Sequence, residues 1–373
     1  MSLTASRFLS VLRDEGVSFF TGVADSLLRP LNSELESLAH GAVHIPAPNE
    51  GSAVALAAGH HLATGNIALV YLQNSGLGNT VNPLLSLADP GVYGIPMLLL
   101  VGWRGEPGRP DEPQHLAQGQ LTRPMLDLLG IPNWVLPQDA ASAEVMVKEA
   151  LARSRADSAP VALVVPKGTI TGEVSAAPAT EGGLTRGAVL EVLLDSLPPD
   201  TVFIATTGYT GRELAQLRVD RGEPDDRDVL VVGSMGHAIS IALGVALSAP
   251  DATVCCVDGD GSFAMHMGAV AAVGRAAPSN LTHVLVNNRV HESVGGQPTA
   301  VDAADLAGVA AALGYPTVVA CRTAEEVQTA VTSDRAGPRF VEVKVTPGAP
   351  DSLIRPEALN ERKVRLMAAL DGA

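Results

Sequence analysis

The sequence predicts an α/β protein built from two doubly wound, parallel-sheet domains. Short runs rich in valine, leucine and isoleucine alternate along the chain with segments of helical spacing, the pattern of repeated strand–helix units. The length of 373 residues suits two domains of ordinary size. A stretch poor in apolar residues, 166–185, divides two halves that share this alternation. We therefore expect a first domain over 1–168, a linker over 169–184 and a second domain over 185–373.

The elements of the first half follow from their apolar spacing and from the residues at their ends. The first helix is expected over 4–15, because apolar residues recur on one face and Thr4 and Gly16 suit its two ends. A helix of small residues should follow Glu50, and residues 74–79 should form a loop at a strand end. The expected strands are 17–20, 67–72, 96–101 and 161–165, and the expected later helices are 52–65 and 140–153.

The second half repeats this rhythm. Two aliphatic runs separated by a helix-like segment, 254–257 and 281–286, indicate a βαβ unit, which is the building block of a parallel sheet. Its expected strands are 202–205, 229–232, 254–257, 281–286, 317–320 and 340–345, and its expected helices include 186–196, 302–313, 323–332 and about 356–370.

Composition limits the classes of partner and the compartment. The net charge of −15 disfavours nucleic acid and anionic membranes as partners. Charged residues interrupt the apolar positions near the amino terminus, and no run of about 18 apolar residues occurs, so we expect neither a signal peptide nor a membrane span. The three cysteines, Cys255, Cys256 and Cys321, lie in apolar runs and are expected to be buried free thiols in a cytoplasmic protein.

Polar residues end both strands of the βαβ unit, where open α/β sheets bind ligands. Asp260, within Gly-Asp-Gly, follows the first strand and Asn288 follows the second. Their oxygens are hard donors that suit Mg²⁺ or Ca²⁺. Gly259 and Gly261 allow close approach of the backbone, and the start of the following helix favours phosphate. The pattern therefore indicates a metal-bridged diphosphate.

Three other interpretations explain the same residues less well, and the motif of one of them, a GxGxxG dinucleotide turn, is absent here. Asp258, Asp260 and Ser262 have the spacing of a calcium loop, but Phe263 and Ala269 stand where an EF-hand needs glycine and glutamate. A plain Asp-Gly turn explains the glycines alone. It does not explain the asparagine pair that follows after one intervening helix.

This arrangement, with the asparagine pair 27 to 28 residues after Asp260, resembles the signature of thiamine-diphosphate enzymes. The sequence segments MHMG, NN and HESVGGQPT are similar to segments of the short decarboxylases of phosphonopyruvate and sulfopyruvate. The resemblance implies that Asp260, Asn288 and the carbonyl of Val290 hold Mg²⁺. It implies that thiamine diphosphate is the cofactor, with Gly259, Gly261 and Ser262 beside it.

The same resemblance extends the cofactor site to other strand ends. A glutamate placed like Glu50 bonds N1′ of the aminopyrimidine in this family, although a carboxylate at a helix start is also an ordinary dipole partner. Thr207 and Gly208 precede a helix and suit a phosphate cradle. Gly233, Ser234 and Met235 match the turn that contacts the aminopyrimidine, where a bulky apolar side chain wedges the cofactor. A core position is the alternative for Met235.

The candidate substrate residues lie in the loops of the first half and beside the asparagine pair. Asp25 and Ser26 precede a helix, so that N-capping is the alternative to a place near the reacting centre. Arg104 and His115 lie in a long Pro/Gly loop that resembles the family's GWRGEPG and DEPQH segments, with a solvated loop as the alternative. His291 completes the set of candidate catalytic residues.

The implied activity is decarboxylation of 3-phosphonopyruvate to phosphonoacetaldehyde and CO₂, in phosphonate and antibiotic biosynthesis. Sulfopyruvate as the substrate, and a non-catalytic, cofactor-binding regulatory subunit, are the alternatives. The linker has no room for the third, central domain of the larger decarboxylases. The resemblance also implies a homodimer or higher homo-oligomer, with active sites between chains and a small 2-oxo acid as substrate.

Overall fold

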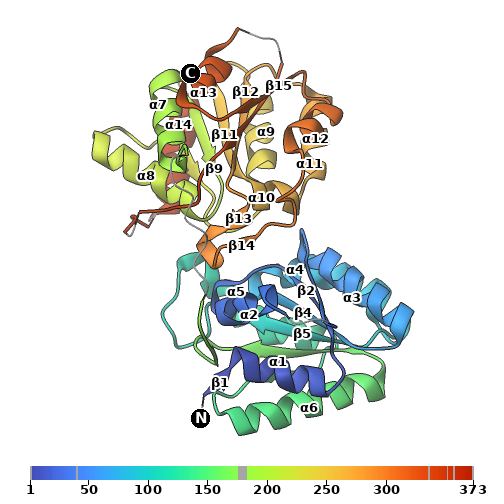
Figure 1. The fold of residues 1–373 in the computed structure, drawn as a ribbon. Coiled ribbons are helices and arrows are strands. Elements are labelled where there is room, and N and C mark those ends of the chain that lie inside the picture. Colours follow the sequence, from blue (N-terminus) through green and yellow to red (C-terminus); the bar gives the residue numbers. More distant parts are fainter. Residues whose placement is uncertain are drawn as a thin grey trace. The chain divides into compact units, whose positions relative to one another are not determined.

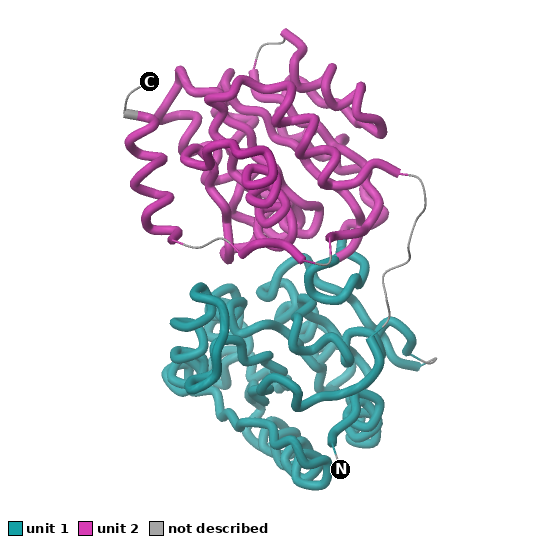
Figure 2. Tube along the Cα trace, turned by 90° about the vertical axis from the view of Figure 1, so that its left-hand side faces the viewer, with its two compact units in different colours: residues 1–177, 291–300 teal, residues 178–290, 301–373 magenta. Residues whose placement is uncertain are grey.

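The chain forms two compact units in a computed structural model that describes residues 2–38, 41–174, 183–334, 337–350, 352–355 and 358–371 (Figure 1). Unit 1 comprises Met1–Ala177 and His291–Ala300, and unit 2 comprises Pro178–Val290 and Val301–Ala373 (Figure 2). Half of the expected linker, 175–182, lies outside the described residues, and the domain boundaries that we drew from the sequence stay a prediction.

Unit 1 is organised around a six-stranded sheet with the order β3-β2-β4-β5-β7-β6, in which every neighbouring pair is parallel. Because the strands are parallel, all their carboxyl ends lie at one edge. The strands of unit 1, within this sheet and outside it, are β1 (Leu3–Thr4), β2 (Phe19–Gly22), β3 (Val43–Pro46), β4 (Ala68–Gln73), β5 (Met97–Gly102), β6 (Asn133–Val135), β7 (Pro160–Val165) and β8 (Ile170–Thr171). Its helices are α1 (Ala5–Asp14), η1 (Ser26–Leu28), α2 (Arg29–Glu36), α3 (Glu50–Thr64), η2 (Asn74–Gly76), α4 (Leu77–Pro83), η3 (Leu84–Ala88), α5 (Pro113–Leu128) and α6 (Ala140–Asp157).

Both faces of this sheet are covered. One apolar core joins the sheet to α1, α2 and α6, and a second joins the opposite face to α3, η3 and α5 (Figure 1). Central strands such as β5 are buried along their whole length, which explains why they read as unbroken aliphatic runs rather than as alternating patterns. A short segment from later in the chain, with η4 (Glu292–Val294) and β14 (Gln297–Pro298), packs beside η1 and α2 in the same unit.

Unit 2 has a second six-stranded parallel sheet, with the order β10-β9-β11-β12-β16-β15. Its faces are covered by α7, α8 and α13 on one side and by α9, α11 and α12 on the other. Its strands are β9 (Val202–Ala205), β10 (Asp228–Leu230), β11 (Val254–Gly259), β12 (Leu281–Asn287), β15 (Thr317–Cys321) and β16 (Arg339–Lys344), with β13 (Val290–His291) passing to unit 1. Its helices are α7 (Arg186–Ser196), α8 (Tyr209–Arg221), α9 (Ala238–Ser248), α10 (Asp260–Met265), α11 (Gly268–Ala276), α12 (Leu306–Ala312), α13 (Ala324–Thr332) and α14 (Leu359–Asp371).

The expected fold class is confirmed, and the buried strands agree with their predicted ranges to within about two residues. The expectation for residues 74–79 is wrong, because this segment forms η2 and the start of α4 rather than a loop. The elements that were not anticipated include the edge strands β3 and β6, the helix α9 and the helix α5, which begins at Pro113. The start of the predicted final helix, 356–357, lies outside the described residues.

The three cysteines are buried free thiols, as expected. Among the described residues, none of the helices has the length and apolarity that crossing a bilayer requires.

Candidate active site

In unit 2 the predicted cofactor residues follow four strands that are neighbours in the sheet, β10, β9, β11 and β12. Gly233, Thr207, Asp260 and Asn288 each come within three residues of the end of one of these strands. The order of strands therefore brings to one edge residues that are up to 81 positions apart in the sequence (207 to 288). This is the edge at which parallel α/β sheets bind ligands.

Asp260 and Asn288 lie at the ends of paired strands. Gly259, the last residue of β11, is in register with Val286 of β12, and each strand ends one residue before its candidate ligand. Asp260 is the first residue of α10 and its side chain is 3% exposed. The Oδ1 atom of Asn288 accepts a hydrogen bond from the Val290 amide at 3.1 Å, which folds the chain back there. A carboxylate, an amide oxygen and a main-chain carbonyl form a donor set that suits Mg²⁺.

The predicted phosphate cradle has the backbone that close approach to an anion requires. Gly208 has φ +95° and ψ −138°, a conformation that residues with a side chain avoid, and it stands directly before the 13-residue helix α8. The hydroxyl of Thr207 donates to the Val232 carbonyl at 3.0 Å and so ties this turn to the end of β10. A helix amino terminus preceded by glycine suits the diphosphate group.

Ser262 holds the turns together from within. Its hydroxyl accepts a hydrogen bond from the Thr206 hydroxyl at 2.9 Å and from the Gly236 amide at 3.1 Å, and the side chain is 4% exposed. Ser262 therefore connects the ends of β9 and β10 to α10. Its hydroxyl has internal partners, so the structure gives it a bracing position, and its place beside the cofactor stays a prediction.

Met235 follows Ser234, a residue with φ +47°, and precedes Gly236, at which a side chain would collide with His266. Met235 is partly exposed, whereas the core methionines of this chain, such as Met97, are fully buried. The partial exposure disfavours the core alternative for Met235. It leaves the apolar side chain available at the ligand-binding edge of the sheet.

In unit 1, Glu50 is the first residue of α3, and Asn49 caps this helix by accepting the Ser52 amide at 2.9 Å. The Glu50 carboxyl is 5% exposed and lies over Gly76, where any side chain would overlap it. Asn79 donates a hydrogen bond to Oε2 of Glu50 at 2.8 Å. Burial raises the pKa of Glu50, although the bond from Asn79 works in the opposite direction. A buried carboxyl of this kind fits a ring nitrogen with which it can share a proton.

Asp25 is fully buried at the end of β2 and lies against Gly102 at the end of β5, where a Cβ would collide with its carboxyl. Neither carboxyl oxygen accepts a hydrogen bond of ordinary geometry, and Asp25 does not cap η1 with its side chain. The capping alternative is therefore wrong. Burial raises the pKa of Asp25 to about 6, against smaller opposing effects of the Leu27 amide and the Arg104 charge.

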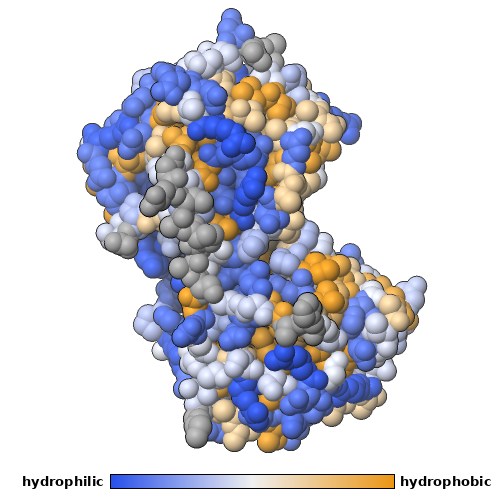
Figure 3. Space-filling model, in the orientation of Figure 1, coloured by the Kyte–Doolittle hydropathy of each residue, from blue (hydrophilic) through white to orange (hydrophobic). Residues whose placement is uncertain are grey.

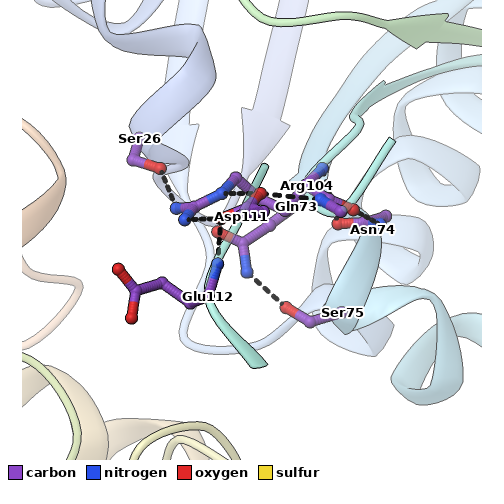
Figure 4. A network of polar contacts seen from close by, with 8 residues as sticks. Ser26, Gln73, Asn74, Ser75, Arg104, Asp111 and Glu112 are labelled. Carbon is purple, nitrogen blue, oxygen red and sulfur yellow. Dashed lines mark hydrogen bonds and ion pairs between the residues drawn. The ribbon is translucent and has the colours of Figure 1, made fainter. Parts of the chain in front are cut away.

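Arg104 is held at the centre of a polar network (Figure 4). It donates to both carboxylate oxygens of Asp111, at 2.9 Å from Nε and 2.5 Å from a terminal nitrogen, and to the Ser26 hydroxyl at 3.0 Å. Its carbonyl accepts a hydrogen bond from the Asn74 side chain at 2.7 Å. The solvated-loop alternative is wrong for Arg104, because its guanidinium is half-buried and fixed in orientation.

His115 and His291, the two candidate histidines, both fall in unit 1. His115 lies in the first turn of α5, and burial followed by the Arg104 charge lowers its pKa to about 4, so it is neutral at pH 7. Its Nδ1 atom is buried without a hydrogen-bond partner. His291 is partly exposed at the start of the segment that packs beside η1, the element that begins with Ser26.

Three residues that shape these sites were not among the predicted candidates. Asp111 orients Arg104, Asn79 contacts Glu50, and Gly102 makes room for Asp25. Asp111 lies within DEPQH and Asn79 within NSGLGN, segments that had been singled out, but their partners lie 7 and 29 residues away. Only the fold shows which side chains meet.

Both halves of the chain match families of known proteins. The family model of the "Thiamine pyrophosphate enzyme, N-terminal TPP binding domain" matches residues 4–126, and that of the "Thiamine pyrophosphate enzyme, C-terminal TPP binding domain" matches residues 207–345. The phosphonopyruvate decarboxylase of Streptomyces hygroscopicus is 39% identical over 95% of this chain and 90% of its own length. That of Streptomyces viridochromogenes is 38% identical over 95% and 91%. The sulfopyruvate decarboxylase of Methanosarcina acetivorans is 29% identical over 84% and 85%.

Proposed function

Because the chain belongs to the family of thiamine pyrophosphate enzymes that contains the phosphonopyruvate decarboxylases, we propose that it decarboxylates 3-phosphonopyruvate. The products are phosphonoacetaldehyde and CO₂, and the reaction needs thiamine diphosphate and Mg²⁺. The observation that carries this proposal is the pairing of Asp260 and Asn288 at the ends of adjacent strands, together with the buried carboxyl of Glu50.

Each residue has a defined task in this proposal. When bound, the cofactor supplies an electron sink for the pair that departing CO₂ leaves behind. Asp260, Asn288 and the Val290 carbonyl hold Mg²⁺, and the backbone around Gly208 and Gly259 receives the diphosphate. Glu50 holds a proton at the aminopyrimidine nitrogen, a role that suits a carboxyl whose pKa is raised by burial.

We assign the proton that replaces the carboxylate to Asp25. A carboxylic acid with a pKa of about 6 is protonated in a fraction of molecules near neutral pH and can still release its proton. Among the described residues neither oxygen has a hydrogen-bond partner of ordinary geometry, so no strong hydrogen bond commits the proton to another protein group. The charged side chain that acts on Asp25 most directly is Arg104, which follows β5, the strand separated from β2 by β4.

Asp25→Asn should lower turnover by a factor of about 100 or more, the usual worth of a general acid, yet stabilise the fold at high pH. Because burial raises the pKa from 3.8 to about 6, the folded protein binds this proton more tightly than the unfolded chain does. The free energy of unfolding therefore falls as pH rises from about 4 to about 6, by at most roughly 3 kcal/mol. The asparagine variant lacks this loss.

Thermal unfolding at about pH 4.5 and about pH 8, with the pH–rate profile, checks this prediction. Asp111→Asn is the control of opposite sign. Burial alone would raise the pKa of Asp111, but the Arg104 ion pair lowers it below its ordinary value, so this variant should lose stability at high pH. An Asp25→Asn protein with normal turnover and no gain in stability at pH 8 would remove Asp25 from the mechanism.

Arg104 is the proposed contact for the phosphonate, because its planar fork matches a tetrahedral oxyanion. Asp111 already occupies one side of the guanidinium, so the substrate must use the side that faces Ser26. The ion pair therefore presents Arg104 in one orientation but also reduces its net charge. We expect the fixed orientation of the guanidinium to contribute as much to recognition of the phosphonate as its positive charge does.

Arg104→Ala should lower kcat/KM for phosphonopyruvate by one to several powers of ten, at roughly 1.4 kcal/mol per tenfold, and affect pyruvate much less. Pyruvate has no second anion that the arginine could bind. Steady-state kinetics with both substrates provide the measurement. Arg7→Ala is the matched control, because Arg7 forms the same two-point pair with Glu144, at 2.6 and 2.7 Å, on the surface of unit 1. Equal losses on both substrates would show that Arg104 only supports the loop.

We further propose a homodimer or a higher homo-oligomer located in the cytoplasm. Unit 1 exposes several large apolar side chains, including Leu62 (63% exposed), Leu85 (43%) and Tyr93 (66%), and Figure 3 shows apolar residues gathered over the α3 side of that unit. Such a patch suits a second copy of the chain. The free thiols suit a reducing compartment. Sedimentation of the purified protein measures the oligomeric state.

The first experiment that tests the proposed activity is release of CO₂ from phosphonopyruvate by the purified chain, supplied with thiamine diphosphate and Mg²⁺. We expect turnover by this chain alone. CO₂ release only after addition of a second, different subunit would favour a regulatory or partial enzyme instead.

A further inference from the structure

Beneath the predicted metal turn lies a buried polar chain of Asp258, His283 and Tyr315, to which the proposed function assigns no role. Asp258 precedes Gly259 on β11, His283 lies on the neighbouring strand β12, and Tyr315 stands two residues before β15. Asp258 and His283 are completely buried, and Tyr315 is 4% exposed. All three residues belong to unit 2.

Tyr315, His283 and Asp258 follow one another in space from the core toward the predicted metal turn. The Tyr315 hydroxyl lies 3.0 Å from Nδ1 of His283. On the other side of the ring, Nε2 faces Oδ2 of Asp258 at 3.7 Å, which is longer than a hydrogen bond, and neither atom has a hydrogen-bond partner among the described residues. The second oxygen of Asp258 accepts a hydrogen bond from the Gly259 amide at 2.9 Å. Since Gly259 ends β11 and Asp260 begins α10, this bond fixes the peptide that leads into the predicted metal ligand.

A second connection passes through aromatic rings. Aromatic residues make up only 3% of the chain, yet Phe263, Tyr315 and Phe340 all surround His283. Phe340 meets the imidazole edge-on, at 5.1 Å and 88°, and Phe263 lies 6.0 Å from it. Phe263 is on α10, three residues after Asp260, so the imidazole also packs against a side chain of this helix.

An apolar trio of the same size would be less costly to bury than a carboxyl, an imidazole and a phenol. The network joins β11 and β12, the two strands whose ends carry Asp260 and Asn288. Partners behind a metal ligand commonly fix its orientation, and their removal costs about 10- to 100-fold in metal affinity.

We propose that Asp258, His283 and Tyr315 are positioning residues that hold the Gly259–Asp260 turn in the geometry that binds the divalent metal. This inference rests on the proposed function of Asp260. When one of these groups is removed, we expect the affinity for the metal to fall more than the stability of the fold. The groups do not contact the metal, but they orient the turn that carries its ligand.

Tyr315→Phe removes only the hydroxyl and keeps the aromatic packing. Titration calorimetry of Mg²⁺ at saturating thiamine diphosphate should show an apparent Kd raised about tenfold. The melting temperature of the cofactor-free protein should change by no more than a few degrees. His283→Gln should weaken Mg²⁺ binding further, and raising the Mg²⁺ concentration should restore the rate in both variants.

Tyr71→Phe is the matched control. Tyr71 is an equally buried tyrosine whose hydroxyl lies 2.7 Å from a ring nitrogen of His44, but this pair is in unit 1, far in sequence from the predicted metal ligands. It should leave the affinity for Mg²⁺ unchanged. If Tyr315→Phe behaves like Tyr71→Phe, the network supports only the fold and the inference is wrong.

Asp260→Ala separates this failure from a failure of the proposed function. Loss of Mg²⁺ binding in Asp260→Ala together with normal binding in Tyr315→Phe would overturn the positioning role alone. Normal Mg²⁺ binding in Asp260→Ala would overturn the metal site itself. If His283→Gln does not fold, the Tyr315→Phe measurement decides the question.

Discussion

Replacing Asp260 with alanine should abolish Mg²⁺-dependent binding of thiamine diphosphate, and with it all turnover. Asp260 is the anionic side chain of the predicted donor set, and the diphosphate charge is poorly compensated without the metal that it holds. The position is buried at the start of α10, so water does not readily replace the lost ligand. Titration calorimetry of thiamine diphosphate with and without Mg²⁺ measures the effect directly.

The control for this change is Asp302→Ala, which removes an exposed carboxylate from the same unit and should bind cofactor normally. Circular dichroism establishes that both variants are folded. Thiamine-diphosphate affinity in Asp260→Ala equal to that of the wild type would contradict the assignment of the metal site.

Glu50→Gln should fold and bind cofactor but lose about 100- to 10,000-fold in turnover, the range expected for a general acid–base group. Glutamine has the same shape, and its oxygen can still accept the hydrogen bond from Asn79. It cannot exchange a proton with the aminopyrimidine nitrogen. The most specific measurement is the rate of deuterium exchange at C2 of the bound cofactor, which should fall together with turnover.

Glu173→Gln, an exposed change in the same unit, serves as the reference for this experiment. Wild-type exchange at C2 in the Glu50→Gln protein would show that Glu50 only starts the helix α3. A protein that no longer binds cofactor would instead place Glu50 among the binding residues.

The buried strands were predictable because the strands of a parallel sheet that is covered on both faces appear in the sequence as continuous apolar runs. Strands such as β9 are unbroken apolar runs bounded by turn residues. The short elements were not. The edge strand β3 carries a proline and two exposed side chains, and α5 begins in a Pro-rich segment and contains Pro124. Their positions depend on packing against the sheet, which overrides local preference.

The candidate site divides in a similar way. Asp260, Asn288 and Glu50 could be proposed from the sequence because each stands directly at a strand end or a helix start, and strand ends meet at one edge. Contacts between distant segments could not. The distance between Tyr315 and His283 is 32 residues in the sequence, and the Asn79–Glu50 bond spans 29. No spacing rule connects such pairs, because they depend on the order of strands in the sheet.

The most direct test of the central claim is the identity of the product. The purified chain, with thiamine diphosphate and Mg²⁺, should convert phosphonopyruvate to phosphonoacetaldehyde, detected by ³¹P NMR and by reduction of the aldehyde. In the same assay kcat/KM should be far higher for phosphonopyruvate than for sulfopyruvate or pyruvate. Turnover of sulfopyruvate in preference to phosphonopyruvate, or no aldehyde from any 2-oxo acid, would contradict the account.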